Sequence, residues 1–262
     1  MHSQPYLLSP APNNTPFPPA EHALREPNGL LAIGGDLTPQ RLLAAYRSGI
    51  FPWFTEGQPP LWWSPDPRTV FHSDSIHLSR RFRRSLRTST WRVRADTMFA
   101  AVIDACASTP RRGQDGTWIT ANMREAYLTL HQHGYAHSVE VFDGTMLVGG
   151  IYGVAIGRMF FGESMFSTHN GASKIALASL AYFLHTHSVP LIDAQVENQH
   201  LLNLGAERWP RRDFLTYVRR LITQTELPAC WSVLFGEKLS RDLVYATTSF
   251  ITLKKIFCAA PR

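Results

Sequence analysis

Hydrophobic residues recur every three or four positions in several stretches of the chain, a spacing that predicts amphipathic helices. The first predicted helix follows Thr38-Pro39 and ends near Gly49, with threonine as the N-cap, proline at the first helical position and glycine as the stop signal. Two further runs have the same spacing of apolar residues. Asp96 is the predicted N-cap of the first run and Thr120 that of the second. Helices are also expected over residues 77–87, 171–187, 198–204 and 211–221.

Elsewhere the hydrophobic period changes to two, which predicts strands. Residues 138–142 alternate between apolar and polar side chains, Asp143-Gly144 supplies a tight hairpin turn, and a second strand returns from 146 to 155. Further strands are expected over residues 91–94, 158–166 and 189–196.

This order of elements is typical of the acetyltransferase-like α+β fold, in which two central strands diverge to admit a substrate. We therefore predict an α+β protein with a mixed, mostly antiparallel sheet. Enzymes of this fold that use coenzyme A hold its pyrophosphate on a glycine-rich loop at a helix N-terminus. Here residues 167–173 contain a single glycine, which argues against a small-molecule acetyltransferase.

The composition limits the class of protein. Of 262 residues, 44% are hydrophobic and 18% are charged, which is too apolar for a disordered chain. No stretch approaches the ~20 apolar residues of a membrane-spanning helix, and the first residues lack a secretory signal pattern. The 3 cysteines form no CxxC pair, which argues against a disulfide framework or a structural zinc site. These features predict a cytoplasmic protein that does not insert into membranes.

The positive charge is concentrated in one segment. Residues 75–95 contain no acidic residue and seven arginines, namely Arg80, Arg81, Arg83, Arg84, Arg87, Arg92 and Arg94. Without these seven, the formal net charge of +6 would be −1. Because the planar fork of arginine suits phosphate, we interpret the segment as a nucleic-acid-binding surface. The alternative is a solvated helix face that only aids solubility.

Aromatic residues gather just before this segment. Five aromatic side chains, three of them tryptophan, lie within residues 51–63 among several prolines. Such rings either fill a core or form a platform on which bases stack, and the sequence favours neither use.

The apolar strand at 191–196 carries two polar residues. Asp193 and Gln195 are two positions apart, so both side chains are expected on the same face. Since a buried carboxylate and amide need partners, we interpret them as a functional pair; the alternative is that they cap a neighbouring backbone. Glu163 lies among large hydrophobic residues beside Gly162, which predicts a bulge or a close backbone approach.

Other chemistries lack their motifs. The histidine pairs at 131/133 and 185/187 have a spacing that does not place two metal ligands on one helix face. No GxSxG nucleophile motif and no GxxxxGK[ST] phosphate loop occurs. The sequence therefore predicts no metal site and no nucleotide hydrolysis.

Several long strings together resemble the bacterial leucyl/phenylalanyl-tRNA–protein transferase family. They span residues 26–37, 49–54, 61–68, 116–120, 136–141, 162–167 and 191–196. The resemblance implies transfer of Leu, Phe or Met from aminoacyl-tRNA to a protein with N-terminal Arg or Lys, which marks that protein for degradation. It implies no cofactor, and we expect a monomer. It also implies a small N-terminal α/β domain with an extended arm over 1–74 and an acetyltransferase-like catalytic domain over 75–235, leaving 236–262 unassigned.

The resemblance also implies roles for individual residues. Asp193 and Gln195 would orient the attacking amine and relay its proton, while Glu163 would meet the cationic side chain or amine of the acceptor. Trp53 and Trp118 would stack on the terminal adenosine, with Tyr46 nearby.

The remaining assignments concern binding. The pocket for the transferred side chain and its surroundings would comprise Ile151, Phe160, Met165, Ser167, Leu177, Leu180, Leu184 and Ile192. Arginines of the 80–94 segment would hold the acceptor-stem phosphates, with the tRNA-binding residues assigned as Arg80, Arg81, Arg83, Arg84 and Arg87. A non-catalytic RNA-binding module is the rival interpretation, since the arginines alone do not require chemistry.

Overall fold

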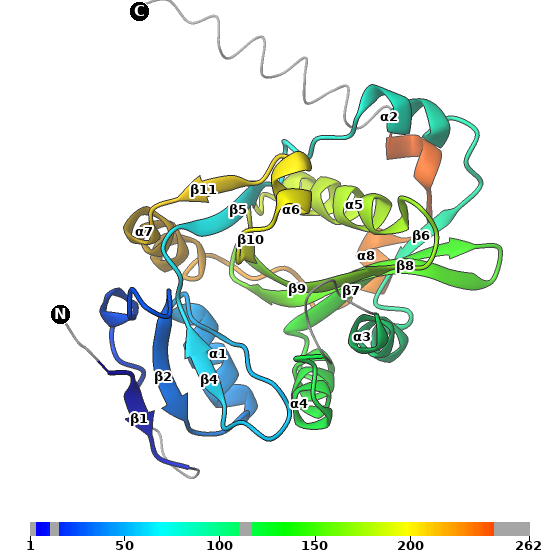
Figure 1. Cartoon of the computed structure of the whole chain (residues 1–262). Coiled ribbons are helices and arrows are strands. Elements are labelled where there is room, and N and C mark those ends of the chain that lie inside the picture. Colours follow the sequence, from blue (N-terminus) through cyan, green and yellow to red (C-terminus); the bar gives the residue numbers. More distant parts are fainter. Residues whose placement is uncertain (1–3, 11–15, 110–116, 244–262) are drawn as a thin grey trace, which may run out of the picture.

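A computed structural model describes residues 4–10, 16–109 and 117–243 of the chain. Its N-terminal part is a four-stranded sheet in the order β1-β2-β4-β3 beside one α-helix (Figure 1). The elements are β1 (Tyr6–Leu8), η1 (Ala20–His22), β2 (Leu30–Gly34), α1 (Pro39–Arg47), β3 (Phe51–Pro52) and β4 (Leu61–Trp63). The aromatic segment at 51–63 thus supplies two strands, and Trp62 is fully buried in the core.

The rest of the chain is built on an eight-stranded sheet in the order β11-β5-β10-β9-β8-β7-β6-β12. Its strands are β5 (Arg68–His72), β6 (Arg92–Ala95), β7 (Ala136–Asp143), β8 (Met146–Ile156), β9 (Met159–Ser167), β10 (Leu191–Gln195), β11 (Glu207–Trp209) and β12 (Lys238–Leu239). Only β9 and β10 pair in parallel within this sheet, and the other described pairs are antiparallel. The predicted mixed, mostly antiparallel α+β architecture is confirmed.

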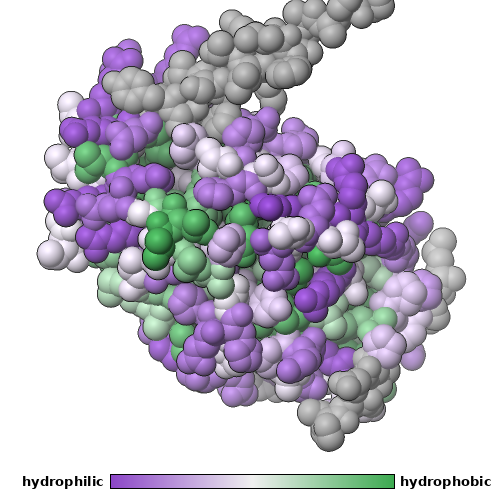
Figure 2. All heavy atoms as spheres, turned by 180° about the vertical axis from the view of Figure 1, so that it is seen from behind, coloured by the Kyte–Doolittle hydropathy of each residue, from purple (hydrophilic) through white to green (hydrophobic). Residues whose placement is uncertain are grey.

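Helices cover both faces of the large sheet (Figure 1). They are α2 (Arg80–Leu86), α3 (Phe99–Ser108), α4 (Ala121–Gln132), α5 (Ala172–Thr186), α6 (Gln199–Asn203), α7 (Arg211–Leu221) and α8 (Trp231–Phe235), followed by η2 (Ser240–Asp242). α5 packs on β7 and β8, whereas α3 and α4 lie on the opposite face. Outside these layers the rear of the molecule is largely hydrophilic, with smaller hydrophobic areas (Figure 2).

The hydrophobic pattern located most elements correctly. Thr38 and Thr120 cap α1 and α4 as predicted, and the Asp143-Gly144 hairpin joins β7 to β8. The prediction that Asp96 caps the next helix is wrong, because α3 begins after Met98. Asp96 instead has a positive φ of 54° and accepts a hydrogen bond from the Ser138 amide, so its carboxylate ties β6 to β7.

The structure can be compared with the predicted domain limits near residue 74 and in the C-terminal extension. β5 precedes residue 74 in the sequence, yet it pairs with β10 in the large sheet. Residues 244–262, most of the unassigned extension, lie outside the described part of the chain. No helix within the described ranges is long and apolar enough to cross a membrane.

Candidate active site

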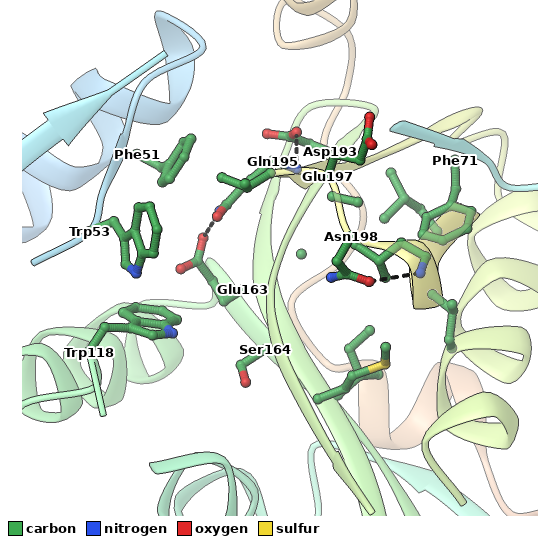
Figure 3. A pocket seen from close by; sticks show the side chains of 18 of the residues that line it. Phe51, Trp53, Phe71, Trp118, Glu163, Ser164, Asp193, Gln195, Glu197 and Asn198 are labelled. Carbon is green, nitrogen blue, oxygen red and sulfur yellow. Dashed lines mark hydrogen bonds between the residues drawn. The ribbon is translucent and has the colours of Figure 1, made fainter. Parts of the chain in front are cut away.

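A pocket of about 460 Å³ opens where β9 and β10 diverge. The two strands are paired only as far as Asp193 and Phe161, and the chain beyond each forms one wall of the pocket (Figure 3). The lining residues are Phe51, Pro52, Trp53, Phe71, Trp118, Ile151, Gly162, Glu163, Ser164, Met165, Leu177, Ile192, Asp193, Ala194, Gln195, Val196, Glu197, Asn198 and Leu201. The pocket therefore draws on both sheets, on α5 and on the loop after β10.

Glu163 enters the pocket from a bulge in β9. Opposite this bulge, the register of β8 moves from Gly153–Gly162 to Tyr152–Ser164, which leaves Glu163 as the extra residue. A Cβ atom on Gly162 would lie 3.1 Å from the Asp193 carbonyl oxygen, so this position favours glycine. The predicted bulge and close backbone approach are both confirmed.

Three side chains donate hydrogen bonds to the Glu163 carboxylate. The hydroxyl of Tyr46 donates to Oε1 over 2.8 Å, that of Tyr127 to Oε2 over 2.7 Å, and Nε2 of Gln195 to Oε1 over 2.7 Å. Tyr46 comes from α1 and Tyr127 from α4, so the carboxylate joins three separate layers. The amide oxygen of Gln195 is left to accept another hydrogen bond, because its nitrogen is turned to Glu163.

The burial of this network changes its protonation. Burial raises the pKa of Glu163 to about 7, and the nearby charge of Asp193 adds to that rise, whereas the three hydrogen bonds act against it. Burial and the Glu163 charge raise the pKa of both tyrosine hydroxyls well above 10, so both stay protonated and donate. A carboxyl that titrates near neutrality is suited to accept and return a proton.

Asp193 borders the pocket, but its carboxylate points away from Gln195 and toward Arg68, so the prediction of a shared face is wrong. The carboxylate is fully buried and forms a bidentate ion pair with Arg68, at 2.8 Å from Nε and 2.6 Å from Nη2. The reason is a second bulge, between Asp193 and Gln195, where the register with β5 shifts and Gln195 adopts a φ of +60°. Figure 3 shows the Gln195 side chain turned toward Glu163 and the Asp193 carboxylate away from it.

The far side of the pocket is apolar. Ile151, Met165, Leu177 and Ile192, four of the eight residues assigned to the side-chain pocket and its surroundings, line it. The other four residues predicted for this region do not line it, namely Phe160, Ser167, Leu180 and Leu184. Phe160, Leu180 and Leu184 are buried in the core beneath α5, and Ser167 at the end of β9 donates a hydrogen bond to the His169 carbonyl oxygen. A single stripe on α5 thus serves the pocket at Leu177 and the core at Leu180 and Leu184.

The opposite side of the pocket is aromatic. Trp53 and Trp118 lie on this side with Phe51 above them (Figure 3). Trp53 is supported from behind by Trp63, whose ring centroid lies 5.7 Å away and whose indole nitrogen donates to the Trp53 carbonyl oxygen. The aromatic segment therefore serves both of its possible uses, because Trp62 fills the core and Trp53 faces the pocket.

The arginines of α2 form an exposed cluster that consists of Arg80, Arg81, Arg83, Arg84 and Arg87. Four of them are exposed and Arg83 is half-buried. Among the described residues no carboxylate pairs with any of the five. Arg92 and Arg94 differ, since both pair with Glu237, at 3.6 and 2.6 Å. The expectation of seven unneutralised arginines therefore holds for the α2 cluster alone.

Two residues that contact the site, Tyr127 and Arg68, were not predicted from the sequence, because each lies far along the chain from its partner. Tyr127 is an ordinary apolar position of an amphipathic helix, and nothing in its spacing marks its hydroxyl as a partner of Glu163. Arg68 offered one signal, an arginine directly before a buried strand segment that continues to Phe71. Within the described ranges, no group of three or more histidine, cysteine or acidic side chains is arranged to hold a metal ion.

Comparison with known proteins adds independent observations. Residues 70–219 match the sequence model of leucyl/phenylalanyl-tRNA protein transferase, and residues 35–66 match that of its N-terminal domain. The chain is 98% identical over 244 residues to a leucyl/phenylalanyl-tRNA–protein transferase of Xylella fastidiosa (strain M23), covering 93% of this chain and 100% of that protein. It is 69% identical to that of Xanthomonas campestris pv. campestris (strain B100), over 91% of this chain and 96% of that protein.

Solved structures are more distant. L-PGS from Bacillus licheniformis aligns with a TM-score of 0.37 and 9% identity over 75% of this chain and 74% of that one. A protein of unknown function from Staphylococcus epidermidis ATCC 12228 aligns with a TM-score of 0.38 and 12% identity, over 55% and 57%. Neither alignment bears on fold or function.

Proposed function

The chain belongs to the leucyl/phenylalanyl-tRNA–protein transferase family, and from that premise we propose how its pocket performs the transfer. The enzyme transfers Leu or Phe from aminoacyl-tRNA to the N-terminal Arg or Lys of a protein, the reaction of the N-end rule. We propose that Met is a third transferable residue, since apolar pockets discriminate only weakly between side chains of similar size.

The reaction needs alignment more than activation. The ester of aminoacyl-tRNA is already reactive, and an α-amine with a pKa near ~8 is partly neutral at pH 7. The amine nitrogen attacks the ester carbonyl carbon, a peptide bond forms, and the bond to the ribose oxygen breaks. The proton lost by the nitrogen ends on that ribose oxygen.

Gln195 and Glu163 are the groups we assign to the amine. The free amide oxygen of Gln195 accepts a hydrogen bond from the amine, because the nitrogen is held by Glu163 at 2.7 Å. Glu163, whose pKa burial raises to about 7, takes the proton and returns it. Asp193 supports Gln195 from behind, since its Oδ1 accepts from the Gln195 backbone amide over 2.9 Å.

The two sides of the pocket suit the two ends of the aminoacyl-adenosine. The apolar side, with Ile151, Met165, Leu177 and Ile192, would receive the Leu or Phe side chain. Trp53 and Trp118 would stack on the terminal adenosine. The α2 cluster would hold acceptor-stem phosphates through charge. Tyr46 takes part through Glu163 and not by direct contact, since it does not line the pocket.

The proposal also includes the fold of the catalytic domain, the oligomeric state and the location in the cell, as predicted from the sequence. The divergence of parallel β9 and β10 below α5 supports an acetyltransferase-like catalytic domain. Action as a monomer is a second part of the proposal. The use of aminoacyl-tRNA supports a cytoplasmic place of work.

The observation that carries the proposal is the Glu163–Gln195 pair set between an apolar wall and an aromatic one. The test incubates the protein with Leu-tRNA labelled in leucine and with peptides that begin with Arg, Lys or Ala. We expect label on the Arg and Lys peptides and none on the Ala peptide or on an Arg peptide with an acetylated N-terminus. Equal label on all peptides, or none, contradicts the proposal.

A variant separates an enzyme from a binding module. Gln195→Ala should lose transfer while it keeps the affinity of the parent for tRNA, measured by filter binding. A second arm offers acetyl-CoA in place of aminoacyl-tRNA. Acetylation of any peptide would favour the small-molecule acetyltransferase instead.

A further inference from the structure

Arg68 is a charged residue with no exposed surface, enclosed between the two sheets. Its guanidinium carbon lies 4.7 Å from the ring centroid of Phe51 and 4.6 Å from that of Phe214, so the charge is sandwiched between two aromatic faces. Nη1 donates to the carbonyl oxygen of Gly49 over 3.2 Å. The side chain thus joins β5 to β3, to the turn after α1 and to α7.

Asp193 uses both carboxylate oxygens within the protein. Oδ2 accepts from Arg68 Nη2, and Oδ1 accepts from Arg68 Nε and from the backbone amide of Gln195. Three hydrogen bonds hold this carboxylate, and because its side chain has no exposed surface it does not contact a substrate. It can influence the reaction only through Gln195.

Gln195 needs that support because its backbone is unfavourable. Its φ of +60° lies in the left-handed region, which is unfavourable for a residue other than glycine. This conformation turns the Gln195 side chain to Glu163, whereas a regular strand would place it on the Asp193 face. The hydrogen bond from its amide to Asp193 stabilises the turn, and Arg68 fixes the oxygen that accepts it.

We propose that Arg68 is a positioning residue for the transfer reaction: through Asp193 it holds Gln195 in the left-handed conformation that aims its amide oxygen at the attacking amine. This inference rests on the proposed function and extends it to a residue that touches no substrate. Lysine cannot replace arginine here, because a point charge cannot contact both oxygens of Asp193 in the planar, two-pronged geometry.

The first test compares Arg68→Lys with the parent protein in steady-state transfer of Leu to an Arg peptide. We expect kcat to fall at least tenfold while KM for Leu-tRNA changes less than threefold, because the apolar wall and the α2 cluster are untouched. Arg211→Lys is the matched control: Arg211 also ties α7 to the N-terminal part, donating to the Ser64 carbonyl oxygen over 2.6 Å, but it does not line the pocket. Its kcat should stay within twofold of the parent.

The second test separates positioning from stability. The double variant Arg68→Met, Asp193→Leu removes both buried charges together, a change that often leaves stability unchanged or raises it. We expect a thermal midpoint near that of the parent and a kcat still at least tenfold lower, since Gln195 has lost its anchor.

Each outcome has one meaning. A folded Arg68→Lys protein, or a folded double variant, with kcat within twofold of the parent overturns the positioning role. Loss of the fold in both variants overturns it as well, in favour of a purely structural ion pair. A parent protein that transfers no leucine refutes the proposed function itself and is thereby distinguished from either result.

Discussion

The network around Glu163 and the α2 cluster hold charge in opposite ways. Around Glu163, which is itself half-buried, the Asp193 carboxylate and the Arg68 guanidinium are fully buried, and each of the three groups has partners at hydrogen-bond distance. In the α2 cluster, five guanidinium groups share one small exposed region without carboxylate partners among the described residues. Buried charges act through geometry over a few ångströms, and exposed ones act through a field that salt screens. The first arrangement suits chemistry, and the second suits the capture of a polyanion.

The largest effect should come from Glu163→Gln, which tests whether the buried network is catalytic. The amide cannot take the proton and cannot accept equally from both tyrosine hydroxyls and Gln195. We expect kcat to fall roughly 100-fold, the scale of a lost acid–base group, with little change in salt dependence. Single-turnover transfer measured at two salt concentrations checks this. Glu125→Gln, on the exposed side of α4, is the control and should keep the parental rate.

The pH dependence should be the next largest effect. Since Glu163 must be ionised to accept a proton, kcat should fall about tenfold per unit below a pH near 7 and level off above it. The contribution of Glu163 to the free energy of unfolding changes with pH in the opposite direction to kcat. The folded-state pKa lies above the ordinary value of 4.5, so the contribution to stability is fully present below pH 4.5 and is lost as pH rises through 7.

This stability term can be isolated by difference. Burial also raises the pKa of Glu140 to about 7, so the parent alone reports both groups. Urea unfolding of parent and Glu163→Gln from pH 5 to 8 should show a difference in their pH slopes, amounting to about 2 kcal/mol. Identical slopes would contradict the shift assigned to Glu163.

A smaller effect on activity is expected from Leu177→Ala, which shortens one apolar side chain of the pocket and removes no charge. The enlarged apolar wall should favour Phe over Leu, moving the ratio of their kcat/KM values by about tenfold. Competition between the two aminoacyl-tRNAs in one reaction gives that ratio directly. Val233→Ala, at an exposed position on α8, is the control and should leave the ratio unchanged. An unaltered ratio in Leu177→Ala would place the transferred side chain elsewhere.

The smallest effect should come from a single arginine, Arg84→Ala. Loss of one phosphate contact should weaken tRNA binding a few-fold and lower the slope of log K against log salt by about 1. The kcat at saturating tRNA should not change, in contrast to Glu163→Gln. Arg212→Ala serves as control, because Arg212 is exposed on α7 and is not part of the cluster. A changed kcat with an unchanged salt slope would break the division between the two regions.

Local signals in the sequence were sufficient for most of the fold. Thr38 and Thr120 begin helices because their hydroxyls accept from backbone amides three residues on, a contact that needs no knowledge of the rest of the chain. The Asp143-Gly144 hairpin is local in the same sense. The prediction for Asp96 is wrong because its carboxylate accepts a hydrogen bond from the backbone amide of Ser138, 42 residues away on a neighbouring strand, and caps no helix.

The site was harder to predict because its contacts are distant in sequence. Several residues of the pocket were predicted, but their orientation depends on two bulges, at Glu163 and before Gln195. Gly162 marks the first bulge in the sequence, whereas nothing in the strand pattern marks the second. The partner of Asp193 lies 125 residues away at Arg68, and one partner of Glu163 lies 117 residues away at Tyr46. Alternation in a strand predicts a face only while the strand stays regular.

The hydroxyl of Tyr46 crosses from the small N-terminal unit into the site and donates to Glu163. The two units consequently cannot be exchanged as independent modules, because removal of the smaller one takes a hydrogen-bond donor from Glu163. Truncation or fusion at this seam would also expose apolar side chains of a hydrophobic core that both units share. Evolution of the smaller unit is therefore constrained by chemistry that takes place outside it.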